Sequence, residues 1–271
     1  MNELRKLASY VALSIAFFLV TPLSTFAYSN VPQHWGIART KNEVPPDAGA
    51  AFNKMLENTG SVYLGNTSKK EIYLTFDNGY ENGFTPKFLD VLKKHDVPAT
   101  FFITGHYIKT NPELVKRMVN EGHIVGNHSW SHPDMTTISD DKILQELEQV
   151  KMAYQELTGR DDMKYFRPAR GIFSERTLSV VNKAGYDNIF WSLAYVDWKI
   201  DQQRGWKYAY DNVMKLIHPG AVILMHTVSK DNAEAMDAVI TALHKRGYTF
   251  RSLDDLMMER SGFNPYFYNP K

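Results

Sequence analysis

The chain contains no cysteine among its 271 residues. It therefore cannot form a disulfide or use a thiolate nucleophile, and a bound metal would need His, Asp, Glu or Asn as ligands. Net charge is almost absent as well, because 31 Lys and Arg residues are balanced by 30 Asp and Glu residues. No basic footprint for nucleic acid is visible. Hydrophobic residues make up 44% of the chain and charged residues 23%, which is typical of a globular protein with a sizeable core.

A long apolar run is found only at the N-terminus. Arg5 and Lys6 precede an apolar segment at 11–20, and a small-x-small sequence ends at Ala27. This arrangement predicts a signal peptide over residues 1–27, with the mature chain beginning near Tyr28. The alternative is a retained membrane anchor, although the apolar segment is short for a complete span. In either case we expect the protein to act outside the cytoplasm, secreted or associated with the cell wall, with the spore envelope as one candidate location.

From residue 71 onward the sequence alternates between strand and helix patterns. This alternation predicts parallel strands joined by crossover helices. Three of the predicted helices end at Gly122, Gly185 and Gly247, as expected for a left-handed residue just beyond a helix. Seven such units favour a closed or nearly closed α/β barrel over an open sheet. The predicted strands span 72–76, 99–103, 124–127, 164–167, 188–192, 221–225 and 248–251.

Residues 28–70 precede this pattern and look irregular. They contain Pro32, Pro45 and Pro46, and only 50–56 has a helical pattern. We expect them to form an N-terminal arm packed on the barrel. Residues 71–271 are expected to form one catalytic domain, with an aromatic tail from Phe263 that packs back on it.

Polar residues collect directly after five of the predicted strands. In a β/α barrel the carboxyl ends of the strands meet at one rim, so these side chains should converge. The set contains acids, histidines and arginines, as expected of a hydrolase site. Its members are Asp77 and Asn78, His128 and His132, Arg167 and Arg170, Asp197 and Trp198, and His226.

The spacing of His128 and His132 suggests a metal site. The two residues are four apart, so on a helical turn both imidazoles could bind the same ion. Asn78 on a neighbouring loop would add an oxygen ligand. Two imidazoles and one oxygen leave an open position for water or substrate, which a catalytic divalent metal requires. An isolated pair with this spacing is more often a capping or surface pair, and that alternative stays open.

The remaining residues predict acid and base catalysis. Asp77 can act as general base, with Arg167 orienting its carboxylate and lowering its pKa by ion pairing. Asp197 beside His226 would raise the pKa of that imidazole and make it a general acid for a leaving amine. The alternatives are a structural salt bridge for Arg167 and a satisfied core histidine for His226. Together the set describes hydrolysis of an amide or ester.

In this order the five segments resemble the motifs of the polysaccharide deacetylases, the NodB-homology group of carbohydrate esterase family 4. The resemblance covers about residues 71–251 and implies a distorted (β/α)7 barrel that removes acetyl groups from an N-acetylated sugar polymer. It implies that Asp77 is the base, that Asn78, His128 and His132 bind the metal, and that His226 is the acid. The segments are TFDNG at 75–79, HSWSH at 128–132, RPARG at 167–171, DW at 197–198 and LMH at 224–226.

Two departures from the family pattern point to the substrate. Asn78 stands where the family usually has Asp, which predicts a weakly held divalent metal, zinc with cobalt or manganese as alternatives. Arg170 stands where many members have an aromatic residue. Both changes make the pocket more positive, and DNGYENG at 77–83 resembles the variant of the muramic δ-lactam-forming de-N-acetylases of spore-forming bacteria. We therefore predict a peptidoglycan deacetylase acting on N-acetylmuramic acid, with Tyr80, Arg170 and Trp198 contacting the substrate.

Three other functions remain possible from the sequence. A deacetylase for N-acetylglucosamine units of peptidoglycan or chitin would share the chemistry but not the substrate. A non-catalytic glycan-binding protein could use surface aromatics such as Trp130, Trp198 and Trp206, but it would not need both an acid and a base. Hydrolysis of a small non-sugar amide is disfavoured by the export signal. The expected partner is the glycan strand of peptidoglycan, with no nucleic acid and no obligate protein partner.

Overall fold

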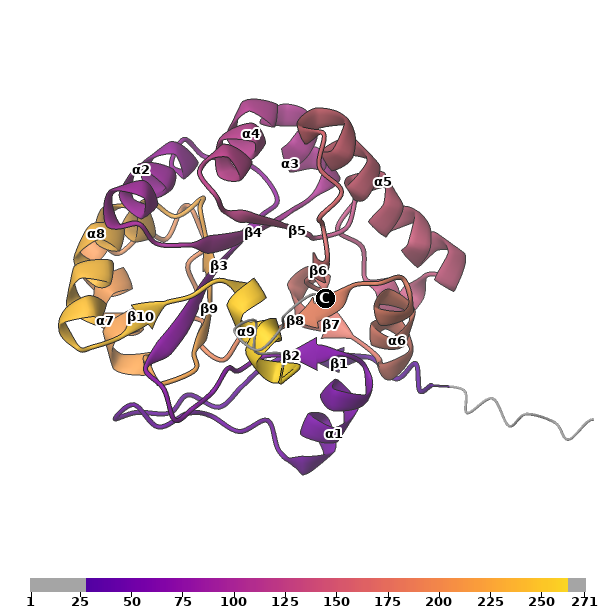
Figure 1. Cartoon of the computed structure of the whole chain (residues 1–271), viewed down its shortest axis with the longest axis horizontal. Coiled ribbons are helices and arrows are strands. Elements are labelled where there is room, and N and C mark those ends of the chain that lie inside the picture. The colour runs from indigo at the N-terminus through magenta and orange to yellow at the C-terminus, as the bar shows by residue number, and fades with distance from the viewer. Residues whose placement is uncertain (1–27, 263–271) are drawn as a thin grey trace, which may run out of the picture.

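A curled sheet of parallel strands forms the centre of the molecule in the computed structural model, which describes residues 28–262 (Figure 1). The longest strand, β3 (Glu71–Asn78), pairs with both β4 (Ala99–Ile103) and β9 (Val222–His226). All seven predicted strands are confirmed, with small changes at their ends. From β4 the pairing continues through β5 (Ile124–Asn127), β6 (Tyr165–Phe166) and β8 (Asp187–Ile189), and β10 (Thr249–Phe250) pairs with the start of β3.

The sheet curls until the segment after β8 reaches β9. Leu193 forms a parallel bridge with Ile223, and the amide of Ser192 donates to the carbonyl of Val222 over 2.9 Å. Hydrogen bonding therefore continues from β3 around to β9, and the expected (β/α)7 architecture is confirmed in a distorted form.

The helices surround this sheet (Figure 1). Gly122, Gly185 and Gly247 have φ values of +81°, +90° and +81°, so each predicted helix-ending glycine is left-handed. Among residues 28–262, no helix is long and apolar enough to cross a membrane. The helices are α2 (Thr85–His95), α3 (Gly105–Thr110), α4 (Pro112–Asn120), α5 (Asp140–Thr158), α6 (Glu175–Lys183), α7 (Trp206–Leu216), α8 (Lys230–Lys245) and α9 (Leu253–Arg260).

Alternating strand residues build two cores. Phe76 stacks on Phe101 between the sheet and its helices, at a centroid distance of 5.0 Å. The alternate residues of these strands point to the inner face of the sheet. They include Tyr73 and Val222 and form an inner cluster on which Leu253 and Leu256 of α9 pack. Helix α9 thus fills the end of the barrel where the strands begin, and the opposite rim is left for the site.

The N-terminal arm is more integrated than expected. Its helix α1 (Ala50–Asn58) was predicted, but β2 (Ser61–Val62) also joins the main sheet beside β8, and β1 (Gln33–His34) pairs antiparallel with β7 (Ile172–Phe173). Residue 71 is therefore not a structural boundary. The signal peptide and the aromatic tail lie outside the described residues.

Candidate active site

A cavity of about 830 Å³ opens at the carboxyl ends of β3, β5, β6, β8 and β9. The structure therefore brings together side chains from five strand ends, as the barrel topology predicts. Arg167 and Asp197 lie directly behind the lining residues and hold them by hydrogen bonds. The predicted residues that line the cavity are Asp77, Tyr80, His128, His132, Arg170, Trp198 and His226.

Asp77 and Arg167 form a buried ion pair at the floor of the cavity. Arg167 is fully buried, and its Nη1 donates to Oδ1 of Asp77 over 2.8 Å. Its Nε and Nη2 donate to the carbonyls of Ile189 and Phe190, so the guanidinium is fixed in one orientation. Burial alone would raise the pKa of Asp77, but the positive charge of Arg167 outweighs burial and lowers the pKa below its usual value. Asp77 is thus held as a carboxylate that can accept a proton.

The predicted pairing of His226 with Asp197 is confirmed. Nδ1 of His226 lies 2.7 Å from Oδ1 of Asp197, whose Oδ2 accepts the backbone N–H of His226 over 2.8 Å. Because the carboxylate can only accept, Nδ1 carries a proton and Nε2 is left for the cavity. Burial lowers the pKa of His226, but the charge and hydrogen bond of Asp197 outweigh it, and the resulting pKa is raised. This is the arrangement of a general acid.

His128 and His132 lie together, but not on a helical turn as expected. The segment after β5 is an irregular loop in which Ser129 and His132 have φ values of +65° and +57°. These left-handed conformations fold the loop back so that the two rings lie 4.8 Å apart. Glu146 of α5 anchors the loop by accepting hydrogen bonds from the N–H and hydroxyl of Ser131. The two histidines lie close together as predicted, but the predicted helical turn was wrong.

Both imidazoles are suited to metal binding. Nδ1 of His128 donates to the carbonyl of Arg167 over 2.8 Å, which leaves its Nε2 unprotonated. Burial lowers the pKa of His128, and burial together with His128 lowers the pKa of His132 to about 4. Both rings are therefore neutral near pH 7. The 3.5 Å contact between His128 Nε2 and Asp77 is accordingly not an ion pair.

The third predicted ligand, Asn78, is held behind the cavity surface. Its Nδ2 donates to Oγ1 of Thr227 over 2.7 Å, whereas its buried Oδ1 accepts no hydrogen bond from any residue between 28 and 262. A cation would satisfy this oxygen. His128 and His132 line the cavity but Asn78 does not, and residues 28–262 contain no group of three His, Asp or Glu side chains that could bind a metal, so the role of Asn78 as third ligand stays a prediction.

The predicted substrate-binding residues lie around the cavity opening. Tyr80 and Trp198 are 44% and 48% exposed, and the Trp198 ring lies 5.6 Å from that of His226. Arg170 is exposed as well, and no salt bridge to it is found among the described residues. Its φ of +56° places the side chain on a tight turn next to the cavity. These three side chains are available for a sugar ligand.

Sequence reasoning did not assign two further features of the site. Trp191 lines the cavity wall, where its ring would lie 2.9 Å from a Cβ on Gly171, so only glycine fits there. Its place at the end of a predicted strand was a usable signal. Asn232 donates to Asp197 from α8, and no sequence motif indicated that contact.

Comparison with known proteins identifies consistent relatives. The polysaccharide deacetylase family model matches residues 64–189. The peptidoglycan-N-acetylmuramic acid deacetylase PdaA of Bacillus subtilis is 57% identical over 234 residues, which cover 86% of this chain and 89% of that protein. An uncharacterised 30.6 kDa protein of Geobacillus stearothermophilus is 62% identical over 268 residues, covering 99% of this chain and all of that protein. The solved structure of B. subtilis PdaA, described as a family 4 carbohydrate esterase, has a TM-score of 0.84 over 86% of this chain and 99% of that chain.

Proposed function

Because this chain belongs to the polysaccharide deacetylases of carbohydrate esterase family 4, we propose that it removes the N-acetyl group of N-acetylmuramic acid in peptidoglycan. The observation that carries the choice of sugar is Arg170, an exposed cation at the cavity that contains Asp77 and His226, with no ion-pair partner within residues 28–262. N-acetylmuramic acid differs from N-acetylglucosamine by a lactyl carboxylate, which an arginine can bind through two hydrogen bonds. The substrate named for B. subtilis PdaA supports the same choice.

Deacetylases of this family are metal-dependent. We propose that His128, His132 and Asn78 would hold a divalent ion, zinc with cobalt or manganese as alternatives. The neutral amide of Asn78 is a weaker ligand than a carboxylate, so the ion should be removed easily. When bound, the ion would supply Lewis-acid polarisation of the acetyl carbonyl and lower the pKa of water.

The protein's own residues then account for the proton transfers. Asp77 takes a proton from the attacking water as the water oxygen bonds to the acetyl carbon. Arg167 keeps that carboxylate ionised and oriented. His226 gives its Nε2 proton to the sugar nitrogen as the C–N bond breaks, and Asp197 stabilises the imidazolium beforehand. The products are acetate and a free amine.

The position of that amine explains how a lactam can follow. The freed amine and the lactyl carboxyl belong to the same sugar, and attack of the amine on the carboxyl with loss of water closes a δ-lactam. Tyr80 and Trp198 would stack on the sugar face while Arg170 holds the carboxylate. Deacetylation of N-acetylglucosamine units is the alternative for the same machinery. With the signal peptide expected at 1–27, we place this activity at the cell wall.

The proposal is tested by measuring acetate release from two substrates. The purified protein is given muramic-acid-containing glycan and chitin oligomers, with Asp77→Asn as the inactive control. We expect release from the muramic substrate to be faster, and Asp77→Asn to be slower by roughly 10²-fold or more. Preference for chitin would reject the muramic assignment. Activity that survives strong chelation, and that no divalent ion raises, would reject the metal assignment.

A further inference from the structure

The carboxylate of Asp197 receives a hydrogen bond from outside the family motifs. Besides its two bonds to His226, its Oδ2 accepts Nδ2 of Asn232 over 2.6 Å. Asn232 is fully buried in the first turn of α8, and its backbone N–H is bound by Oγ of Ser229. Three donors therefore fix both the position and the plane of the Asp197 carboxylate.

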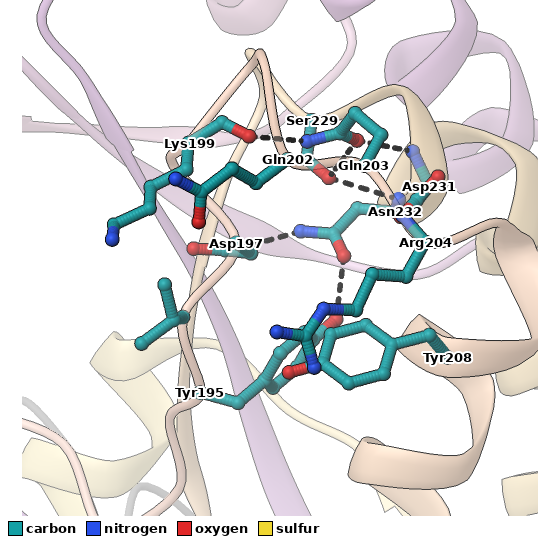
Figure 2. Close-up of a pocket in the computed structure, with 11 residues that line it drawn as sticks. Tyr195, Asp197, Lys199, Gln202, Gln203, Arg204, Tyr208, Ser229, Asp231 and Asn232 are labelled. Carbon is teal, nitrogen blue, oxygen red and sulfur yellow. Dashed lines mark hydrogen bonds between the residues drawn. The ribbon is translucent and has the colours of Figure 1, made fainter.

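Tyr195 determines which way the Asn232 amide points. The hydroxyl of Tyr195 donates to Oδ1 of Asn232, and Figure 2 shows the amide between Tyr195 and Asp197. A carboxylate only accepts hydrogen bonds, so it requires the NH₂ group of Asn232, and the amide oxygen must then accept from Tyr195. Burial raises the pKa of Tyr195 well above its usual value, so the phenol remains a donor.

The loop that carries Asp197 is attached to α8 independently of Asn232. Oε1 of Gln203 accepts from Oγ of Ser229 and from the N–H of Asp231, and the N–H of Arg204 donates to the Asp231 carboxylate. The residues that make these contacts line a small cavity of about 30 Å³ beside Asp197 (Figure 2). Loss of the Asn232 amide should therefore reorient the carboxylate without detaching the loop.

We propose that Asn232 is a positioning residue for His226, acting through Asp197, with Tyr195 holding the Asn232 amide in the required orientation. The inference rests on the proposed deacetylation, in which His226 protonates the leaving amine. Without Asn232 the carboxylate can turn about its Cβ–Cγ bond, and the Nδ1–H of His226 loses its fixed acceptor. The Nε2 proton is then presented to the sugar nitrogen in the right direction for less of the time.

The test is a double-mutant cycle on Asn232→Leu and Tyr195→Phe. A positioned general acid accelerates the reaction by roughly 10²- to 10⁴-fold. We therefore expect Asn232→Leu to lower kcat at least about 10-fold, with KM changed less than about 2-fold. Tyr195→Phe should lower kcat less. The double variant should be no slower than Asn232→Leu, because Tyr195 acts only through the amide. If the losses in kcat of the two single variants multiply in the double variant, or if Asn232→Leu changes only KM, the proposal is overturned.

Asn188→Leu is the matched control for loss of a buried amide. Asn188 is also fully buried, but within residues 28–262 its side-chain amide donates to the backbone carbonyls of Thr59 and Leu178 and to no residue of the site. We expect this variant to unfold more easily and to keep the kcat of the folded enzyme. A similar fall in kcat for Asn188→Leu would show that the loss at Asn232 is a general packing effect.

Proton NMR gives a readout that does not depend on the substrate. The hydrogen-bonded Nδ1–H proton of His226 should give a downfield resonance, assigned by its loss in His226→Gln. We expect it to broaden or shift upfield in Asn232→Leu, and an unchanged resonance would contradict the positioning role. If the wild-type protein prefers chitin, the muramic proposal fails, and the cycle is run on chitin instead. The two failures are therefore distinguishable.

Discussion

At the scale of single residues, the proposal assigns to Arg170 the distinction between an anionic and a neutral sugar. A charge-assisted hydrogen bond contributes about 1.5–3 kcal/mol, so Arg170→Ala should lower kcat/KM on the muramic substrate by roughly 10- to 100-fold. On glucosamine oligomers we expect a change below about 3-fold. Arg170→Lys keeps the charge but loses the paired donors, so its kcat/KM on the muramic substrate should lie between those of the wild-type protein and Arg170→Ala. Equal losses on both substrates would show that Arg170 does not contact the carboxylate.

The pairing of Asp197 with His226 predicts a pH dependence. Asp197 contributes to the raised pKa of His226, and only the protonated imidazole can act as the acid. Activity should therefore be lost as the pH rises through that raised pKa. Asp197→Asn removes the negative charge, so the alkaline limb of the kcat profile should move to lower pH. An alkaline limb that stays in place in this variant would remove His226 from the acid role.

The residues of the site were more predictable than their geometry. The ion pair of Asp77 with Arg167 and the pairing of Asp197 with His226 followed from strand order, because parallel strands bring their carboxyl ends to one rim. The helical turn at His128 was wrong, since left-handed backbone at non-glycine residues leaves little signal in a sequence. Asn232 was missed for a related reason: its function comes from a contact across elements, not from a motif.

At the scale of elements, the N-terminal arm supports the cavity wall. Trp35 packs against Phe173 and Phe190, and its Nε1 donates to the carbonyl of Trp191, which lines the cavity. The proline-rich sequence predicted an irregular arm, and β2 was missed because a two-residue strand has no periodicity to detect. The arm is therefore part of the folded domain.

Truncation of Trp35 measures this support. Trp35 is almost fully buried, so Trp35→Ala should lower the free energy of unfolding by about 3–5 kcal/mol in urea denaturation. Trp35→Phe keeps an aromatic ring and removes mainly the hydrogen bond to Trp191, so it should cost about 1 kcal/mol. If the two variants are equally stable, the arm does not depend on this packing.

At the scale of the whole molecule, His123 should make stability sensitive to mild acid. It is buried at the start of β5 with neither ring nitrogen hydrogen-bonded within the described residues, and burial lowers its pKa to about 4. In the unfolded chain the His123 imidazole binds a proton near pH 6.5. The stability that neutral, buried His123 contributes is therefore complete above pH 6.5 and is lost as the pH falls toward 4. Between pH 7 and pH 5 it amounts to about 2 kcal/mol.

The control for this pH effect is His123→Leu. The other buried histidines are unchanged in the variant, so the difference between the two proteins isolates His123. We expect the unfolding free energy of the wild-type protein to fall more steeply between pH 7 and pH 5 than that of the variant. Parallel curves would mean that His123 is solvated or paired in solution.

The central claim is that the protein deacetylates N-acetylmuramic acid, and mass analysis of digested peptidoglycan tests it most directly. Glycan strands are incubated with the protein at controlled pH, cut into muropeptides, and compared with a sample treated with Asp77→Asn. We predict products in which the muramic residue has lost its acetyl group, followed by products that have also lost water. Muramic residues that keep their acetyl groups, with the loss found on glucosamine or on neither sugar, would contradict the account.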